Sequence, residues 1–234
     1  CDCGNSGTSA RLLMGLFAAR CGRFRLHGDA SLSRRPMKRV TGLLSQMGAR
    51  FEGGDCLPLI VQGSALSSVT LSTAVASAQV KSALILAALQ AAGTSVIEEP
   101  AASRDHTERM LVAMGAPLQS TGLRTVRVEG GGAALLPLHL DVPGDPSSAA
   151  FAIALACLLP GSHVTVENIA LNPRRIGFYR LLSRMGAKLE LEQRVDSPEP
   201  TGSITARGSL LHGIDVAAAD VVDAIDELPL LATV

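Results

Sequence analysis

Aromatic residues are scarce in this chain of 234 residues, which has five Phe, one Tyr and no Trp. Proteins that bind single-stranded nucleic acids stack the bases on aromatic side chains, and this chain offers few such platforms. Its formal net charge of zero also provides no general attraction for polyanions. We therefore expect no nucleic-acid partner.

Long apolar runs are missing as well. The longest, residues 149–159, is shorter than the roughly 18 apolar residues that a membrane-spanning helix needs. No positively charged segment precedes a signal-like apolar one, so a secretory signal is not indicated. Because 47% of the residues are hydrophobic and 18% are charged, we expect a folded protein without a membrane partner. The expected location is the cytoplasm.

No pattern in the chain is typical of a metal or disulfide site. The five Cys residues are scattered without a Cys-x-x-Cys pair, and the five His residues show no ligand spacing on a helix. Zinc sites and disulfide frameworks are recognised by such spacings. We therefore expect neither a bound metal nor a cofactor.

What the chain does contain is an internal repeat of about 70 residues. Met-Gly-Ala occurs three times, and its glycines, at positions 48, 115 and 186, are 67 and 71 residues apart. Each triplet ends a stretch with apolar residues three or four positions apart, which predicts an amphipathic helix with a glycine C-cap. These helices are expected within residues 35–49, 105–116 and 174–187.

Another helix is expected before each of these, and its start is marked by Ser6, Ser77 or Ser147. These earlier helices are almost entirely apolar or small, which predicts that protein surrounds them. Short strands are expected between the two helices of each copy, at 24–28, 94–99 and 163–169. Strands ending in glycine follow each Met-Gly-Ala, at 57–63, 124–130 and 203–208. One more strand, 138–144, is expected to lead into the third copy.

The repeating unit is therefore β-α-β-α-β-β, which predicts an α/β (α+β) fold with helices inside and sheets outside. Pro143 and Gly144 interrupt the pattern, so we expect one domain over residues 1–142 and another over residues 143–234. A fourth copy begins near residue 221 and then stops. We expect both domains to be incomplete.

Residues 4–11, GNSGTSAR, form the first candidate site. They combine backbone N–H groups at a helix start with the hydroxyls of Ser6, Thr8 and Ser9 and the guanidinium of Arg11. A helix N-terminus carries positive partial charge and binds anions. The alternative is an ordinary cap on a tightly packed helix.

Positive charge is concentrated in residues 31–39, SLSRRPMKR. Either Arg34 or Arg35 could hold a carboxylate or a phosphate through two parallel hydrogen bonds. The alternative is a solvated basic helix start, although arginine there opposes the helix dipole.

Polar residues accompany the other expected helix starts: Gln79, Lys81, Arg104 and Asp145, the last of them a plausible cap. Asp226 and Glu227 precede an apolar run; either could cap that helix, and one could act as a base. Several helix starts and arginines in one repeat architecture predict a small substrate with two anionic groups.

Seven motifs follow one another in the chain: GNSGTSARLLMG, GDASLSRRPMKR, ASAQVKSALI, SRDHTERML, DVPGDPSSAAF, NPRRIGFYRLLSRMGA and IDELPLLA. In this order they resemble the motifs of the EPSP synthase family (3-phosphoshikimate 1-carboxyvinyltransferase), and the resemblance covers essentially the whole chain. It implies the enolpyruvyl transferase fold, an inside-out, barrel-like α/β arrangement. In that fold two domains of three β-α-β-α-β-β units each hold the active site in the cleft.

The resemblance also implies an activity. The family transfers the enolpyruvyl group of phosphoenolpyruvate to the 5-hydroxyl of shikimate 3-phosphate and releases phosphate. This reaction belongs to the shikimate pathway, which leads through chorismate to the aromatic amino acids. The implied partners are these two substrates and the inhibitor glyphosate, with a monomer expected for the complete protein.

The family's phosphoenolpyruvate site corresponds to residues near the start of the chain. By resemblance, Asn5, Gly7 and Thr8 border this site, and Arg35 binds the charged groups as a catalytic residue. Some family members tolerate glyphosate through a larger residue at the position of Gly7. Glycine at this position predicts that the intact enzyme is sensitive to glyphosate.

The shikimate side of the site corresponds to later motifs. By resemblance, Ser77, Ala78 and Gln79 line the site of the shikimate phosphate, with Gln79 near both ligands. Arg104 binds the same phosphate. Asp226 is the catalytic carboxylate that engages the reacting hydroxyl.

The chain also departs from the family pattern. The early Gly-Asp-Lys-Ser motif with its catalytic lysine is absent, and so is the later third of the family sequence. The chain is therefore expected to cover the central half of a family member and not to be a competent catalyst alone. One alternative is a fragment that only binds ligands or folds. Another is the related transferase acting on UDP-N-acetylglucosamine, which usually carries a reactive loop cysteine not found beside Arg35.

Overall fold

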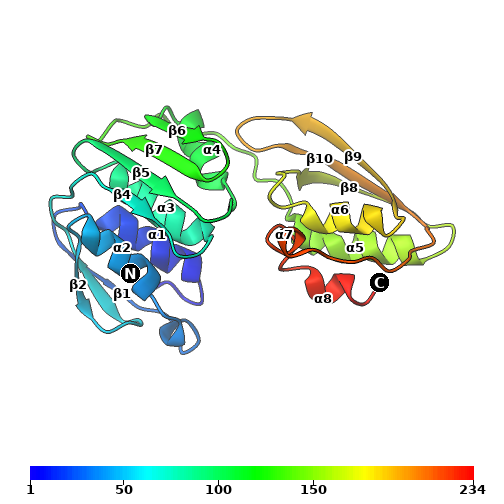
Figure 1. The fold of residues 1–234 in the computed structure, drawn as a ribbon, viewed down its shortest axis with the longest axis horizontal. Helices are drawn as coiled ribbons and strands as arrows, with labels where there is room; N and C mark the ends of the chain where they lie inside the picture. The colour runs from blue at the N-terminus through cyan, green and yellow to red at the C-terminus, as the bar shows by residue number, and fades with distance from the viewer. The chain divides into compact units, whose positions relative to one another are not determined.

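The computed structural model describes residues 1–234, with the side chain of residue 219 left out. The chain forms two compact units (Figure 1). Unit 1 contains Cys1–Ser103 and Leu111–Pro137, and unit 2 contains Arg104–Met110 and Leu138–Val234. The domain boundary at residue 142 stays a prediction. No helix in the described part of the chain is long and apolar enough to cross a membrane.

The first copy of the repeat supplies two helices and a sheet to unit 1. Its elements are α1 (Gly7–Phe17), β1 (Arg23–Leu26), the short 3-10 helix η1 (Leu32–Arg34), α2 (Lys38–Gln46), β2 (Arg50–Gly53) and β3 (Leu59–Gln62). The closing strand β3 lies in the middle of the sheet, antiparallel to β1 and β2. Before α1, Asp2 pairs in parallel with His27, just after β1.

The second copy repeats this order, with a strand before its first helix and without the 3-10 helix. Its elements are β4 (Thr70–Ser72), α3 (Ala78–Ala88), β5 (Thr94–Glu98), α4 (His106–Ala113), β6 (Leu118–Thr121) and β7 (Thr125–Glu129). The sheet runs β4-β5-β7-β6; β4 is parallel to β5, and β7 is antiparallel to both of its neighbours. The closing strand again lies between the two strands that precede it.

The third copy lies in unit 2. Its elements are α5 (Pro146–Leu158), β8 (His163–Ala170), α6 (Gly177–Arg184), β9 (Lys188–Val195) and β10 (Thr201–Arg207), followed by α7 (Ala218–Val221) and α8 (Leu228–Leu231). The sheet order β8-β10-β9 matches that of the first copy. The repeat predicted from the Met-Gly-Ala spacing is thus confirmed.

The strand predicted over residues 138–144 does not form. Of these residues, only Gly144 pairs, in parallel with Ile169. Pro143 has no N–H to donate to a ladder, and most of the preceding residues are exposed. The alternation of Leu138, Leu140 and Val142 with polar residues is therefore not sufficient to form a strand here.

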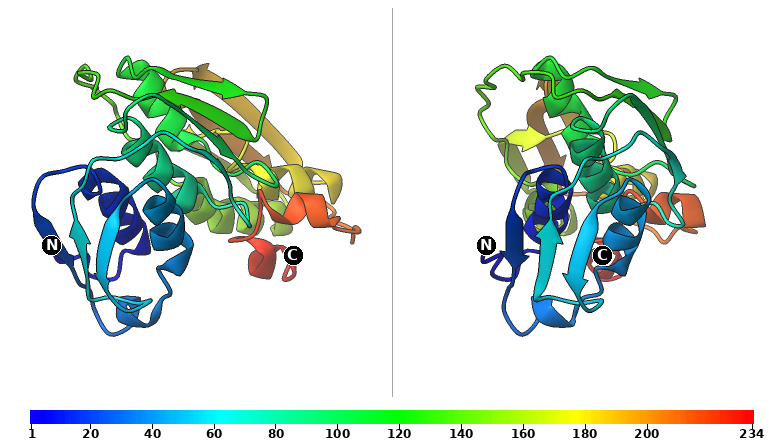
Figure 2. Two further views of the ribbon diagram at one scale, coloured as in Figure 1. Left: turned by 60° about the vertical axis from the view of Figure 1, so that its left-hand side comes forward. Right: turned by 90° about the vertical axis from the view of Figure 1, so that its left-hand side faces the viewer.

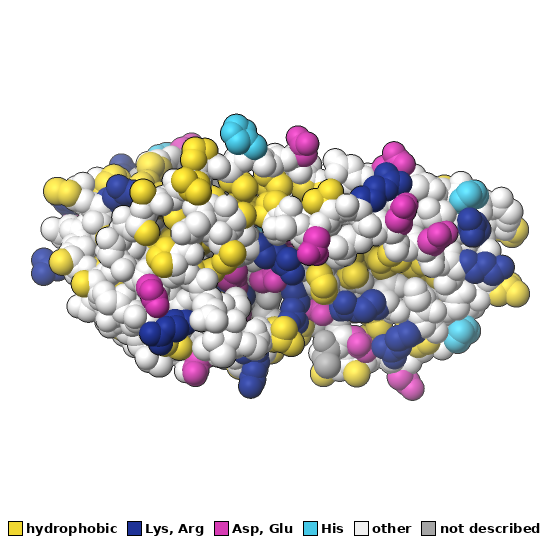
Figure 3. Space-filling view, turned by 90° about the horizontal axis from the view of Figure 1, so that it is seen from above, with side chains coloured by type: hydrophobic (Ala, Val, Ile, Leu, Met, Phe, Trp, Pro, Cys, Tyr) yellow, Lys and Arg dark blue, Asp and Glu magenta, His cyan; other side chains and the backbone are white. Residues whose placement is uncertain are grey.

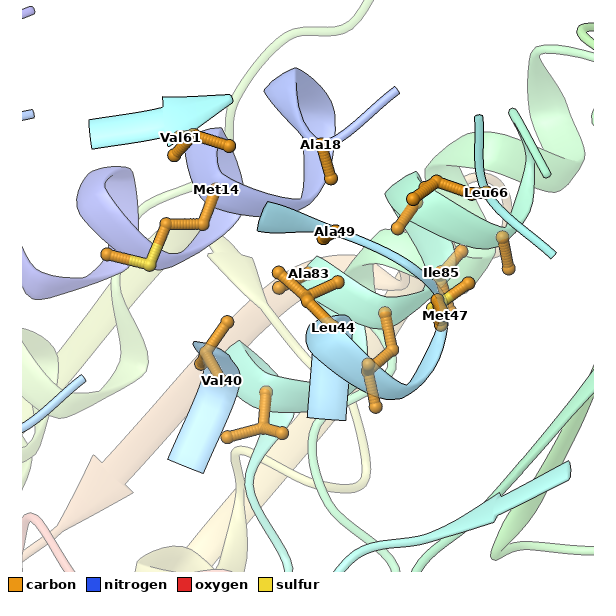
Figure 4. Packing of buried hydrophobic residues seen from close by; sticks show 14 of the residues in the cluster. Met14, Ala18, Val40, Leu44, Met47, Ala49, Val61, Leu66, Ala83 and Ile85 are labelled. Atoms are coloured by element: carbon orange, nitrogen blue, oxygen red, sulfur yellow. The ribbon is translucent and has the colours of Figure 1, made fainter. Parts of the chain in front are cut away.

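Helices α1, α2 and α3 of unit 1 pack together, and the two sheets of the unit lie outside them (Figures 1 and 2). Figure 4 shows Met14 of α1, Leu44 of α2 and Ala83 of α3 among the side chains of the shared core. A Cβ on Gly15 of α1 would overlap the carbonyl of Ala83, so the two helices approach at backbone distance. The prediction of helices inside and sheets outside is confirmed for this unit.

The expectation that protein surrounds every first helix holds for α3 and is wrong for α5. Residues 80–85 of α3 are all buried. On α5, Phe151 is 66% exposed and Leu155 is 56% exposed. The reason is that α5 packs on β8 and β10, which cover its other face.

Two kinds of glycine recur in the three copies. The glycines of Met-Gly-Ala have left-handed φ angles of 101°, 79° and 100°, as the predicted helix C-caps require. The glycines after the closing strands lie against the backbone that follows the first helix of the same copy. A Cβ there would overlap a carbonyl oxygen, namely that of Arg20 for Gly63, of Ala91 for Gly130 and of Leu159 for Gly208.

Charged side chains of both signs are interspersed on the face of the molecule drawn in Figure 3. This mixture agrees with the formal net charge of zero. Recognition of an anion therefore depends on local arrangement of arginines rather than on a general positive field.

Candidate anion-binding site

A tight loop leads into the first turn of α1. Gly4 has a left-handed φ of 51°, and its N–H donates to Asp2 Oδ1 at 2.9 Å. Ser6 is the N-cap, and its Oγ accepts the N–H of Ser9 at 3.1 Å. The sequence left open whether this segment caps a helix or binds an anion. Ser6 performs the first role, which leaves the other polar side chains of the segment for other partners.

Arg35 follows η1 in an extended conformation and reaches the loop before α1. Its Nη2 donates to Asn5 Oδ1 at 2.7 Å and to Ser31 Oγ at 3.4 Å. Asn5 in turn donates through Nδ2 to Asp29 Oδ2 at 2.6 Å. The N–H of Leu32, together with this bond from Asn5, lowers the pKa of Asp29. An ionised Asp29 thus fixes the Asn5 amide with its oxygen toward Arg35.

Arg11 connects α1 to α3. Its Nη1 donates to the carbonyl of Gly7 and to Gln79 Oε1, both at 3.0 Å. Gln79 in turn donates a hydrogen bond from Nε2 to Thr8 Oγ1 at 2.7 Å. Residues that are about 70 positions apart in the sequence therefore meet because the first helices of two copies pack side by side.

Positive charge accumulates at this point. Burial, together with the nearby charges of Arg35 and Arg39, lowers the pKa of Arg11. The hydrogen-bond acceptors of Arg11 and Arg35 are carbonyl, amide and hydroxyl oxygens, all of them neutral. Because guanidinium groups repel one another and ionised acceptors bind them more strongly, the arrangement favours an anion.

Gly7 lies between the two guanidinium groups. A Cβ at this position would be 2.6 Å from Arg11 Nη1 and 3.4 Å from Arg35 Nη1. Any larger residue would displace one arginine or occupy the space that the groups of a ligand need. The absence of a Cβ at Gly7 thus leaves both guanidinium groups in their observed positions.

The start of α3 differs from the starts of α1 and α5. Ser77 occupies the N-cap position with an extended backbone, but its side chain makes no cap hydrogen bond. By contrast, Ser6 caps α1 and Asp145 caps α5. The first N–H groups of a helix need acceptors. Since Ser77 Oγ does not serve as one, Ser77, Ala78 and Gln79 form a second place suited to anionic oxygens.

Unit 2 carries its own cluster of charges. Arg104 Nη2 donates to Asp226 Oδ2 at 2.5 Å. Arg175 Nη1 lies 3.8 Å from the same oxygen, while its Nη2 binds Asp145 and donates to Ser147 Oγ at 3.0 Å. Asp226 is 51% exposed, so its carboxylate is accessible even while Arg104 holds it.

Three acidic residues, Asp145, Asp226 and Glu227, were candidates for helix caps. Asp145 accepts the N–H groups of Ser147 and Ser148 at 3.2 and 3.1 Å, so its prediction as a cap is confirmed. Glu227 stands at the N-cap position of α8 but makes no side-chain cap bond there. Asp226 instead pairs with Arg104.

The structure brings together most of the residues singled out in the sequence. Those gathered in unit 1 are Asn5, Gly7, Thr8, Arg35, Ser77, Ala78 and Gln79. Arg104 and Asp226 meet in unit 2. The sequence analysis did not single out Asp29, Glu99 and Arg175, which contact Asn5, Ser77 and Asp226, respectively. Their sequence contexts are weak indications of a role: an Asp after glycine, a Glu after a strand, and the second of two adjacent arginines.

Solved structures share this architecture. Two structures of EPSP synthase from Acinetobacter baumannii superpose with a TM-score of 0.89 at 39% sequence identity, covering 98% of this chain and 53% of theirs. The repeated units therefore define the chain's class by fold, which is the fold of these EPSP synthase structures over the part they share.

Sequence comparison then gives the family. A model of the family EPSP synthase (3-phosphoshikimate 1-carboxyvinyltransferase) matches residues 1–234, and the chain belongs to this family. Relatives named 3-phosphoshikimate 1-carboxyvinyltransferase include those of Limosilactobacillus fermentum and Synechococcus sp. (strain RCC307). They are 48% identical over 231 and 239 residues, respectively 97% and 99% of this chain. The chain spans about half the length of these relatives, 53% and 55%.

Proposed function

We propose that this chain supplies substrate-binding residues to an enzyme that transfers the enolpyruvyl group of phosphoenolpyruvate to the 5-hydroxyl of shikimate 3-phosphate, releasing phosphate. The observation that carries the proposal is the pair Arg11 and Arg35, which flank Gly7 and bind only neutral acceptors. Both substrates carry phosphate. Relatives at 45–48% identity bear the name of this enzyme.

Phosphoenolpyruvate offers a carboxylate and a phosphate to the arginines of unit 1. In this proposal Arg35 binds its charged groups, while Asn5, Gly7 and Thr8 border the same space. The present acceptors of Arg35, an amide and a hydroxyl, are weaker than a charged oxygen. Binding therefore exchanges neutral partners for an ionised one and breaks no salt bridge of Arg35.

In unit 1, shikimate 3-phosphate would use the start of α3; the residues proposed in unit 2 are Arg104 and Asp226. Ser77 offers its hydroxyl, Ala78 its N–H group, and Gln79 its N–H group and side chain to the shikimate phosphate. Arg104 currently pairs with Asp226, and a phosphate on Arg104 would replace that pair. The released Asp226 carboxylate would then accept the proton of the 5-hydroxyl as a general base.

Calorimetric titration tests the proposal. Shikimate 3-phosphate is expected to bind the wild-type chain first, and phosphoenolpyruvate or glyphosate to bind in its presence. Arg35→Ala should weaken the second event by at least about tenfold, since a hydrogen bond to a charged group contributes about 1.5–3 kcal/mol. The first event should remain.

Arg34→Ala is the matched control, because Arg34 is the exposed neighbour with the same charge. It should leave both binding events unchanged. A folded wild-type chain that binds neither substrate, or an equal loss in both variants, would contradict the proposal.

A further inference from the structure

A buried ion pair lies beneath the start of α3. Lys81 belongs to α3 and Glu99 follows β5; Lys81 Nζ is 2.9 Å from Glu99 Oε2. The side chains are only 4% and 1% exposed. Lysine and glutamate are almost never this buried unless they are paired.

Such a pair is a costly way to stabilise a core. Removing two charges from water costs several kcal/mol, and well-packed apolar residues of similar volume are often as stable or more stable. The rest of α3 is apolar or small, so the packing there does not require charge. The contacts of Glu99 indicate what else the pair does.

Glu99 contacts the chain at three places. Its Oε1 accepts a hydrogen bond from the backbone N–H of Ser77 at 3.1 Å. Its Oε2 accepts a hydrogen bond from the hydroxyl of Ser103 at 2.9 Å and forms the ion pair with Lys81. Ser77 is the N-cap of α3, whose own side chain makes no cap bond. The carboxylate of Glu99 therefore fixes, through the backbone, a helix start whose serine hydroxyl is not used as a cap.

We propose that Glu99 is a positioning residue, with Lys81 as its counter-ion, that holds the start of α3 in the conformation that binds the shikimate phosphate. This inference rests on the proposed function for the identity of the ligand. Glu99 fixes the N–H of Ser77, so that Ser77 Oγ and the following N–H groups can serve the ligand. Lys81 neutralises a carboxylate that would otherwise repel the phosphate.

Two double variants separate this role from simple stability. Lys81→Met with Glu99→Gln removes both charges and keeps an oxygen acceptor for Ser77. Lys81→Met with Glu99→Leu removes the acceptor too. By calorimetry, we expect the glutamine variant to bind shikimate 3-phosphate within about threefold of wild type, and the leucine variant at least about tenfold more weakly.

Amide hydrogen exchange on the ligand-free chain gives a second readout. The N–H of Ser77 should exchange at least about tenfold faster in the leucine variant than in the glutamine variant. Val128→Ala, a buried core truncation in β7, is the control for lost stability. It should leave the affinity for shikimate 3-phosphate unchanged, and it should not raise the exchange of Ser77 more than that of other amides in unit 1.

The outcomes are distinguishable. If both double variants fold and match each other in affinity and in exchange, Glu99 has no positioning role. If wild type does not bind shikimate 3-phosphate but Ser77 still exchanges faster in the leucine variant, the proposed function fails while the anchoring of α3 stands. Should the leucine variant not fold, Glu99→Asp withdraws the carboxylate by one methylene and is expected to show the same weakened binding.

Discussion

At the scale of single residues, the candidate site depends on the absence of a Cβ atom at Gly7. Two arginines approach this position from different parts of unit 1, Arg11 from α1 and Arg35 from the end of η1. Both are held by neutral oxygens, so that they are oriented and still able to bind a charged one. Under the proposed function, the glycine between the two guanidinium groups determines which anion fits.

Gly7→Ala is expected to lower affinity without harming the fold. The new methyl group meets the flexible end of Arg11, which can move, and alanine is favoured over glycine in a helix by about 0.5–1 kcal/mol. With shikimate 3-phosphate present, glyphosate should bind at least about tenfold more weakly by calorimetry. The wild-type chain should bind glyphosate readily.

Gly42→Ala provides the matched control for this substitution. Gly42 lies in α2, and a Cβ there would have nothing within 4 Å. This variant should bind glyphosate as wild type does. An unaltered affinity in Gly7→Ala would show that the space beside Gly7 is not part of the site.

At the scale of elements, three equivalent helices begin in three different ways. Ser6 caps α1 with a hydroxyl, and Asp145 caps α5 with a carboxylate. The start of α3 relies on Glu99, which lies beyond the next strand. This difference agrees with the proposed function, in which the start of α3 binds the shikimate phosphate.

Replacing Asp145 should destabilise unit 2 in a way that depends on pH. Burial alone would raise the pKa of Asp145, but hydrogen bonds from Ser148 and Ser147 and the charge of Arg175 outweigh it and lower the pKa. A lowered pKa in the folded state gives stability that is present above the unfolded value of about 3.9 and lost as the pH falls through the folded value.

Asp145→Ala should therefore lower the free energy of unfolding by about 1–2 kcal/mol at pH 7, the usual value of a lost cap. The difference from wild type should shrink toward pH 2, as urea unfolding at several pH values can measure. Asp141→Ala, at an exposed aspartate outside any helix, should show little difference at either pH. A pH-independent difference for Asp145→Ala would contradict the role of its charge.

At the scale of the whole molecule, the described residues form two separate hydrophobic cores. One contains side chains from α1, α2, α3 and their sheets, and the other contains side chains from α5, β8, α6 and β10. Each core is formed within a single unit. A change in one core should therefore act on its own unit.

Leu182→Ala, at a fully buried position of α6, should lower the stability of unit 2 by about 2–5 kcal/mol. Native-state hydrogen exchange should show lost protection in α5, β8 and β10, with α1 and β3 unchanged. Leu84→Ala in α3 should give the reciprocal pattern. Loss of protection in both units from either variant would show that they unfold as one.

The repeat is the part of the fold that the sequence predicts best. Met-Gly-Ala marks a helix end where only a left-handed residue fits, and the apolar spacing before it defines a helix face. These are local signals, and they place α2, α4 and α6; the strands β2, β4, β6 and β9 received no bounds from the sequence. The strand expected at 138–144 failed because pairing needs a neighbour along its whole length, which a local pattern does not reveal.

The site is predictable only in part for the same reason. Asn5, Thr8 and Arg35 belong to motifs with recognisable chemistry. In the structure Arg35 donates a hydrogen bond to Asn5, and Gln79 donates one to Thr8. Glu99 shows no such motif, because its role comes from a contact with Ser77 across 22 positions. Lys81 was the available clue: a lysine in an apolar helix requires a buried partner.

The glycines that end the three closing strands have a consequence for how such a chain can change over time. Gly63, Gly130 and Gly208 share a position at which any side chain would collide with backbone. The three copies differ in sequence, yet each has a glycine at this place. What they share here is a position that excludes a side chain. A designer who adds a further copy would place a glycine after its closing strand first and choose the apolar residues afterwards.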